Sequence, residues 1–216
     1  MIDYVAKTKD FVKMELEGAE GGHDWFHIER VYKNALLIAD KSPDCNRLVV
    51  ELAALLHDIA DSKFNDGDEE IGPAKARGFL RAIGVPEEVE QHVVDIIANI
   101  SFKGGNFEAS FSSLELQIVQ DSDRLDALGA IGIARAFNYG GFKNRALYNP
   151  DIAPEMTMSK EAYKKADGPT INHFYEKLLL LKDKMNTEAG RAVAQERHRF
   201  MELFLAQFYS EWEGDK

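Results

Sequence analysis

The sequence has little cysteine and no long apolar run. Cys45 is the single cysteine among 216 residues, so no internal disulfide is possible and an oxidising compartment is not indicated. The first ten residues lack the apolar segment of a signal peptide, and no apolar stretch reaches the ~18 residues that cross a bilayer. These absences predict a cytoplasmic protein without a membrane partner.

Basic residues are scarce relative to acidic ones. Lys and Arg number 26 against 37 Asp and Glu, which gives a formal net charge of −11. A dedicated nucleic-acid binder normally presents a basic face, so no nucleic-acid partner is expected. An anionic small substrate remains compatible with this charge, because a bound divalent cation dominates the local field of its site. No pattern in the sequence indicates an oligomeric state.

Strand signals are also lacking. No sustained alternation of apolar and polar residues is bounded by turn residues, and only six prolines interrupt the helical patterns. The length suits one sizeable hydrophobic core. We therefore predict one all-α domain over residues 1–216.

Capping residues and hydrophobic repeats at helical spacing predict individual helices. The repeat over residues 28–39 places His27 in the first turns of an amphipathic helix. Further helices are predicted over about 42–60 with Ser42 as N-cap, over 72–84, from Pro86 onward, after a capping box of Ser112 and Glu115, over about 170–186, and after the N-cap Thr187. Residues 138–158 have low helix propensity and predict an irregular segment, which at that length is usually functional or mobile.

A His-Asp pair ends an apolar segment in Glu51-Leu-Ala-Ala-Leu-Leu-His57-Asp58-Ile-Ala-Asp61. A buried charge is costly unless it is paired or bound to a metal ion. The pair is therefore a candidate for metal ligation, although such a dipeptide also occurs by chance.

Further ligands come from two other segments. His27 is one candidate, with a hydrogen-bonded core histidine as the alternative. The second is an aspartate of the sequence Asp121-Ser-Asp123, and helical spacing does not choose between the two, since each shares a face with apolar residues. Both aspartates stay open on this evidence.

Two imidazoles and two carboxylates suit one octahedral divalent ion with positions open for water and a substrate oxygen. A closed structural zinc site would instead need four tetrahedral ligands, usually including cysteines. We expect Mn²⁺ first, with Mg²⁺, Co²⁺, Ni²⁺, Fe²⁺ or Zn²⁺ as alternatives. Such an ion lowers the pKa of a bound water, from ~15.7 towards ~7 in the best-known zinc case, and polarises a phosphoryl oxygen. This chemistry predicts a metal-dependent hydrolase.

The ordered set of His27, His57-Asp58 and Asp123-Arg124-Leu125 resembles the HD-domain metal-dependent phosphohydrolase superfamily. Phrases such as His57-Asp-Ile-Ala-Asp-Ser-Lys63-Phe64 and Asp123-Arg-Leu-Asp-Ala-Leu-Gly129 resemble its small stand-alone bacterial members, and the similarity extends over roughly residues 20–210. The resemblance implies a helical HD-domain fold and one metal ion held by His27, His57, Asp58 and Asp123. It also implies a metal core at about 20–135, with C-terminal helices at about 159–210 packed on it.

The resemblance further implies hydrolysis of phosphate esters or anhydrides, with a nucleotide or another phosphate ester as the small-molecule substrate. We expect cleavage of a nucleoside triphosphate to monophosphate and pyrophosphate. The alternatives are a nucleotide monophosphatase, a phosphodiesterase, a non-catalytic module that senses a nucleotide, and a purely structural domain whose four residues never meet. Between His57-Asp58 and Asp123 the only further histidine is His92, which disfavours a dinuclear centre.

Residues in the same region are candidates for catalysis. Asp61 is expected to orient a water or act as general base, with an acidic helix end as the alternative. His23 is expected to donate a proton or meet substrate at the rim. Lys63 and Lys103 are expected to bind phosphate oxygens, with ordinary solvated lysines as the alternative.

Three residues farther along the chain are candidates for substrate binding. Lys143 and Arg145, in the segment predicted to be irregular, are expected to close over a polyphosphate as a lid, with an ordinary exposed loop as the alternative. His173, beside Phe174 and Tyr175, is either a substrate ligand or a buried structural histidine.

Overall fold

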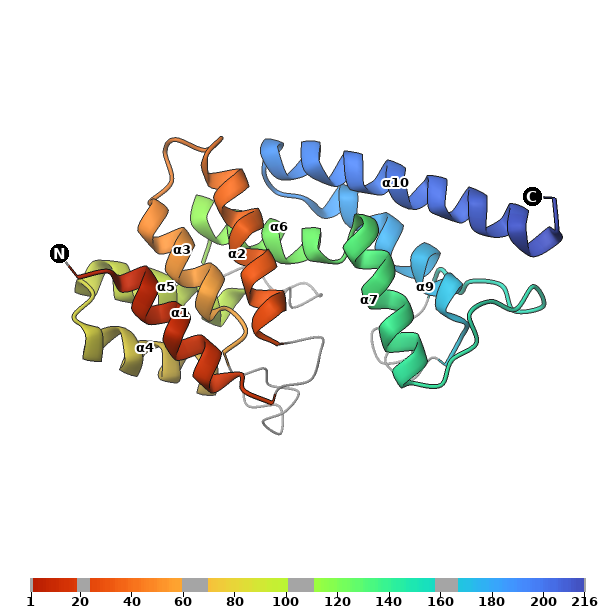
Figure 1. The fold of residues 1–216 in the computed structure, drawn as a ribbon. Coiled ribbons are helices and arrows are strands. Elements are labelled where there is room, and N and C mark those ends of the chain that lie inside the picture. Colours follow the sequence, from red (N-terminus) through yellow and green to blue (C-terminus); the bar gives the residue numbers. More distant parts are fainter. Residues whose placement is uncertain (1, 19–23, 60–69, 101–110, 158–166, 216) are drawn as a thin grey trace. The chain divides into compact units, whose positions relative to one another are not determined.

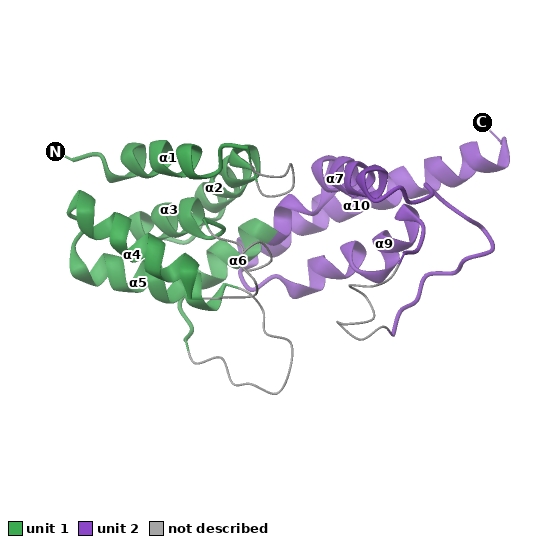
Figure 2. Cartoon of the chain, turned by 90° about the horizontal axis from the view of Figure 1, so that it is seen from below, with its two compact units in different colours: residues 1–123 green, residues 124–216 purple. Residues whose placement is uncertain are grey.

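The computed structural model describes residues 2–18, 24–59, 70–100, 111–157 and 167–215 (Figure 1). Within these ranges the structure consists of helices and contains no strand, which confirms the predicted all-α class. No helix among them is long and apolar enough to cross a membrane. The chain divides into two compact units, unit 1 (Met1–Asp123) and unit 2 (Arg124–Lys216), coloured separately in Figure 2. A single domain over both units stays a prediction.

Unit 1 is built around α3. Its helices are α1 (Tyr4–Glu15), α2 (Trp25–Ala39), α3 (Arg47–Leu56), α4 (Ile71–Ile83), α5 (Glu87–Asn99) and α6 (Leu114–Asp126), of which α6 continues past the unit boundary. Seven of the ten residues of α3 are buried, because α1, α2 and α5 all pack against it. The apolar run before His57 needs such neighbours, whereas the charged residues of the helix, Arg47 and Glu51, pair with each other at 3.0 Å.

The start and end of α3 differ from the prediction. The helix begins at Arg47 rather than near Ser42, and the side chain of Asn46 caps it by accepting a hydrogen bond from the Val49 N–H (3.3 Å). The Ser42 hydroxyl instead donates to the Ile38 carbonyl at 3.0 Å, so it serves the end of α2. Residues 57–59 form a turn, so the predicted helix ends four residues earlier than about residue 60.

The predicted capping box of α6 is also corrected. Ser113 rather than Ser112 caps the helix, since its Oγ accepts from the Leu116 N–H at 3.1 Å. Glu115 reaches across to the backbone N–H of Asn46 at 2.7 Å instead of folding back on its own helix. Other boundaries agree closely with the prediction: α4 ends at Gly84, which has a φ of 79°, and α5 begins after Pro86.

Unit 2 is organised along α10. Its helices are α7 (Gly129–Phe142), α9 (Thr170–Glu176), the 3₁₀ helix η2 (Leu178–Lys184) and α10 (Glu188–Glu213), which begins at the predicted cap Thr187. Helix α10 packs against α7 and η2. An aromatic cluster extends from the buried Phe174: ring centroids 5.0–6.1 Å apart connect Phe137, Tyr148, Phe174, Phe204, Phe208 and Trp212.

Two predictions in unit 2 were wrong. The segment 138–158 is irregular only from residue 143, because α7 continues through Gly140 and ends where Asn144 adopts a φ of 55°. Gly140 lies against α9, and a Cβ there would stand 2.1 Å from the Thr170 Oγ1, so close packing rather than flexibility explains this glycine. The helix predicted over 170–186 breaks at Lys177 (φ −142°, ψ −57°).

The irregular segment is tied to α9. Four hydrogen bonds join them, from Thr170 N–H to the Ala146 carbonyl (2.9 Å), Ile171 N–H to the Leu147 carbonyl (3.0 Å), Asn172 Nδ2 to the Ile152 carbonyl (3.0 Å) and Glu155 N–H to Glu176 Oε1 (3.1 Å). Residues 146–155 are therefore held against the helix through their backbone atoms, by both the backbone and the side chains of α9.

Candidate metal centre

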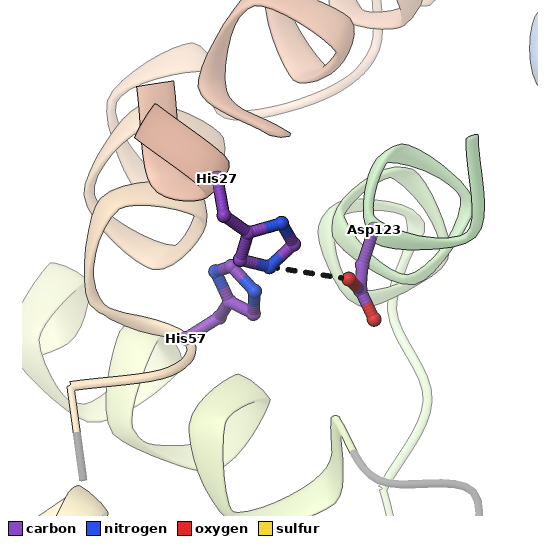
Figure 3. A group of neighbouring side chains, drawn as sticks. All are labelled: His27, His57 and Asp123. Carbon is purple, nitrogen blue, oxygen red and sulfur yellow. Dashed lines mark ion pairs between the residues drawn. The ribbon is translucent and has the colours of Figure 1, made fainter. Parts of the chain in front are cut away.

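Three side chains predicted as metal ligands meet in unit 1. One donor atom from each of His27, His57 and Asp123 lies within 4.8 Å of the others (Figure 3). They come from α2, from the turn after α3 and from α6, three segments far apart in the sequence. The structure therefore brings these three predicted ligands to one place.

His27 is anchored at the start of α2. Asp24 caps this helix, and its Oδ1 accepts a hydrogen bond from the His27 N–H at 2.9 Å. The imidazole is buried, with 3% of its side chain exposed, and its Nε2 lies 3.6 Å from Oδ1 of Asp123. The Asp123 side chain is 47% exposed, so the group opens to solvent on the side of the carboxylate.

His57 is held in one tautomer by its own turn. Its Nδ1 lies 2.9 Å from the Ala54 carbonyl oxygen, and because a carbonyl only accepts, Nδ1 must carry the proton. In the neutral ring, Nε2 then keeps a lone pair. Metal-binding histidines are commonly oriented in this way, by a hydrogen bond from the other ring nitrogen to a carbonyl.

A buried hydrogen bond joins α2 to α6 next to Asp123. Asn34, two turns after His27 on α2, donates through Nδ2 to the Ser122 carbonyl at 3.1 Å. Both residues are buried, and Ser122 immediately precedes Asp123. Asn34 thus positions Asp123 relative to His27. The sequence analysis missed it, although a polar residue seven positions after His27 within the apolar stripe of a helix was the available signal.

The spacing of His27 and Asp123 fits two ligands of one divalent metal ion. Two atoms that each bind an ion at ~2.0–2.2 Å are at most roughly 4.4 Å apart. The separation of 3.6 Å between His27 Nε2 and Asp123 Oδ1 lies within that limit. Imidazole nitrogens suit Zn²⁺, Fe²⁺ or Ni²⁺, and the carboxylate oxygen also suits Mn²⁺.

The aspartates beside these residues have different positions. Asp58 follows His57 in the turn and is half-buried, but it is not one of the three residues whose donor atoms gather within 4.8 Å. Its part as a fourth ligand stays a prediction. Asp121 is fully buried, whereas Asp123 belongs to the group, so its position favours Asp123, whose part as a ligand stays a prediction.

The remaining candidates of this region, His23, Asp61, Lys63 and Lys103, lie outside the described residues. Their proposed parts in proton transfer and phosphate binding stay predictions.

The three candidates for substrate binding lie in unit 2. The Lys143 ammonium stands 5.2 Å from the centroid of the Phe142 ring, and the Arg145 guanidinium 5.6 Å from that of Tyr139. Arg145 Nε is also 3.4 Å from Asp167 Oδ1. Burial, together with the charges of Lys177 and Arg145, lowers the pKa of His173 to about 4, so its ring is neutral at pH 7. Substrate binding by these three residues stays a prediction.

Comparison with known proteins covers most of the chain. The HD domain model matches residues 25–128, a range that includes His27, His57, Asp58 and Asp123. YpgQ of Bacillus subtilis strain 168 is 37% identical over 209 residues, which cover 96% of this chain and 93% of YpgQ. A crystal structure of an HD-superfamily hydrolase from Bacillus thuringiensis is 46% identical, covers 97% of either chain and has a TM-score of 0.79. The crystal structure of Bacillus subtilis YpgQ in complex with ADP is 33% identical in structural alignment, covers 96% of this chain and 94% of that one, and has a TM-score of 0.75.

Proposed function

This chain belongs to the HD superfamily of hydrolases, and from that premise we propose that it cleaves nucleoside triphosphates to monophosphates and pyrophosphate. The observation that carries the proposal is the meeting of His27, His57 and Asp123 in unit 1. The complex of the related YpgQ with ADP supports a nucleotide as the substrate class.

In this proposal His27, His57, Asp58 and Asp123 hold one divalent ion, with Mn²⁺ preferred. When bound, the ion supplies a water of lowered pKa and polarises a phosphoryl oxygen. His57 presents its Nε2 lone pair to the ion because the proton is on Nδ1, where it is donated to the Ala54 carbonyl. The buried bond of Asn34 to Ser122 keeps the Asp123 carboxylate opposite His27.

Further residues predicted from the sequence complete the proposed reaction. Asp61 accepts the proton of the attacking water, and His23 donates one to the leaving group. Lys63 and Lys103 neutralise phosphate oxygens as point charges. Lys143 and Arg145 bind the polyphosphate as a lid, and the neutral His173 forms a hydrogen bond with the substrate.

A panel of ribo- and deoxyribonucleotides, assayed with each divalent metal in turn and with product identification, tests the proposal. We expect Mn²⁺-stimulated release of pyrophosphate, and loss of at least 100-fold in turnover for Asp123→Asn, which keeps the shape of the side chain. Asp151→Asn, an exposed aspartate of unit 2, is the matched control and should retain full activity. No turnover above Asp123→Asn on any phosphate ester or anhydride would overturn the proposal.

The products separate the competing functions. Release of inorganic phosphate from monophosphates would identify a monophosphatase, and opening of cyclic or diester substrates a phosphodiesterase. Tight binding of an intact nucleotide at every metal, without hydrolysis, would identify a sensing module.

A further inference from the structure

Unit 2 contains a pocket that the metal centre does not use. Its volume is about 360 Å³, at the lower end of the roughly 300–1,000 Å³ typical of small-molecule sites. The residues that line it are Tyr148, Pro150, Ile152, Ala153, Pro154, Asn172, Tyr175 and Tyr209. A volume of this size suits a single ring system rather than a long chain.

The walls of this tyrosine pocket are held in place before any ligand arrives. One wall consists of residues from the irregular segment, namely Tyr148, Pro150, Ile152, Ala153 and Pro154, and the opposite wall includes residues of α9 and α10. Two hydrogen bonds join the irregular segment to α9: Asn172 donates to the Ile152 carbonyl, and the Glu155 N–H donates to the Glu176 carboxylate. The Tyr148 ring is fixed by edge contacts to Tyr209 and Trp212, with centroids 5.3 Å and 5.0 Å away. A pre-formed pocket loses little conformational entropy on binding.

The lining is aromatic, polar and uncharged. Three half-buried tyrosines offer ring faces or edges, and none of the described residues that line the pocket is charged. Burial and a hydrogen bond with Tyr175 raise the pKa of Tyr209 well above its ordinary value, so this phenol stays neutral. A charged ligand group would be desolvated here without a partner of opposite charge, whereas a neutral planar ring would stack.

Polar groups for recognition are also present. Asn172 is buried, with 2% of its surface exposed, and one amide hydrogen is used by the Ile152 carbonyl. A second amide hydrogen and the Oδ1 oxygen remain, which is a donor and acceptor pair on one side chain. Such a pair matches the edge of a heterocycle that itself carries a donor beside an acceptor.

We propose that the tyrosine pocket of unit 2 binds the nucleobase of a nucleoside or nucleotide. The base stacks on the tyrosine rings, and the Asn172 amide hydrogen-bonds to its edge. Because the pocket lacks charge, the phosphate contributes nothing there, and binding needs no metal ion. The proposal therefore stands independently of the hydrolytic reaction.

Titration of the full chain with nucleosides in the presence of EDTA tests it, since nothing can then be hydrolysed. Adenosine, guanosine, cytidine and uridine are followed by backbone amide NMR, with ribose as the control ligand. We expect shifts at pocket residues, including the amides of Ala153 and Asn172, and none with ribose. No shift with any nucleoside up to its solubility limit, or shifts confined to unit 1, would contradict the proposal.

Variants and phosphorylated ligands sharpen the test. Tyr148→Leu should weaken nucleoside binding about tenfold, the scale on which aromatic stacking with a base contributes, while Tyr209→Phe keeps the ring and should change affinity less. Phe200→Leu, an exposed aromatic residue of α10 outside the pocket, is the matched control and should bind normally. A nucleoside monophosphate should bind about as well as its nucleoside, and a more than tenfold preference for the monophosphate would contradict an uncharged site. Should Tyr148→Leu fail to fold, the wild-type shifts decide.

Discussion

Unit 1 and unit 2 divide the net charge of the chain unequally. Unit 1 has 12 Lys and Arg against 24 Asp and Glu, a net charge of −12, whereas unit 2 has 14 against 13, a net charge of +1. An acidic surface raises the local concentration of cations, which suits the unit that carries the candidate metal ligands. The nearly neutral unit suits the uncharged tyrosine pocket and the cations Lys143 and Arg145. The net charge of each unit is thus compatible with the kind of ligand proposed for it.

The two units also differ in the side chains that pack around their candidate sites, which are aliphatic in unit 1 and aromatic in unit 2. In unit 1 the aliphatic α3 is buried along its length and delivers His57 at its end, so the ligand position depends on close aliphatic packing. In unit 2 the aromatic rings of Phe208 and Trp212, on α10, contact the ring of Tyr148 in the irregular segment. The aliphatic packing of unit 1 fixes the position of the His57 imidazole, whereas the aromatic rings of unit 2 form a surface on which a planar ring can stack. Each prediction below changes one unit and uses the other as its reference.

The largest expected effect concerns the pH dependence of unit 2. The pKa of His173 is about 4 in the folded protein against 6.5 for the ordinary group, so the unfolded chain binds more protons between these values. Stability from His173 is therefore present above pH 6.5 and lost as the pH falls to about 4, a loss of at most ~3 kcal/mol. His173→Gln should remove this part of the pH dependence.

Tryptophan fluorescence separates the units in this measurement, because Trp25 lies in unit 1 and Trp212 in unit 2. Urea unfolding in a Trp25→Phe background, from pH 7.5 to pH 4, follows unit 2. Parallel pH profiles for the chains with and without His173→Gln would contradict the assignment of a neutral, buried His173.

Two buried asparagines offer a matched pair, one in each unit. Asn34 and Asn172 both donate an amide hydrogen to a backbone carbonyl, and both are nearly inaccessible. Either alanine substitution leaves a buried carbonyl short of a donor and should cost ~1–3 kcal/mol. Asn34→Ala should also weaken Mn²⁺ affinity roughly tenfold, as loss of a supporting hydrogen bond does at metal sites. Asn172→Ala should weaken nucleoside binding and leave Mn²⁺ affinity unchanged.

Calorimetric titration of both variants with Mn²⁺ and with adenosine checks this pair. Loss of both affinities in both variants would show general destabilisation rather than separate sites.

The smallest effect concerns two helix caps within unit 1. Asp3 and Asp24 each accept a hydrogen bond of 2.9 Å from a backbone N–H in the first turn, on α1 and α2 respectively. Alanine at either position should cost ~1 kcal/mol of stability. Only Asp24→Ala moves the start of the helix that carries His27, so only this variant should weaken Mn²⁺ binding in the same titration. Equal affinities in the two variants would show that the cap does not position the ligand.

The fold class and most helices were predictable from the sequence, because caps and apolar repeats are local signals. Pro86, Gly84 and Thr187 marked helix ends correctly. The failures depended on distant contacts. Asn46 rather than Ser42 caps α3, because the Ser42 hydroxyl is bonded to the Ile38 carbonyl of α2. Helix α7 continues through Gly140, because Thr170 packs against this glycine.

The candidate site shows the same limit. Spacing within α6 did not separate Asp121 from Asp123, since the choice depends on where α2 and the turn after α3 lie. The family resemblance supplied Asp123, and the structure places that residue beside His27 and His57. Asn34 was missed because its role requires a partner on α6, 88 residues away in the sequence.

Anomalous diffraction at the manganese edge, from a crystal grown with Mn²⁺, tests the central claim most directly. We predict one peak at about 2.0–2.3 Å from His27 Nε2, His57 Nε2 and an Asp123 carboxylate oxygen, with Asp58 as the fourth protein ligand. The peak should vanish in Asp123→Asn and persist in Asp151→Asn. A peak elsewhere in the chain, or no peak with Mn²⁺ in excess, would contradict the account.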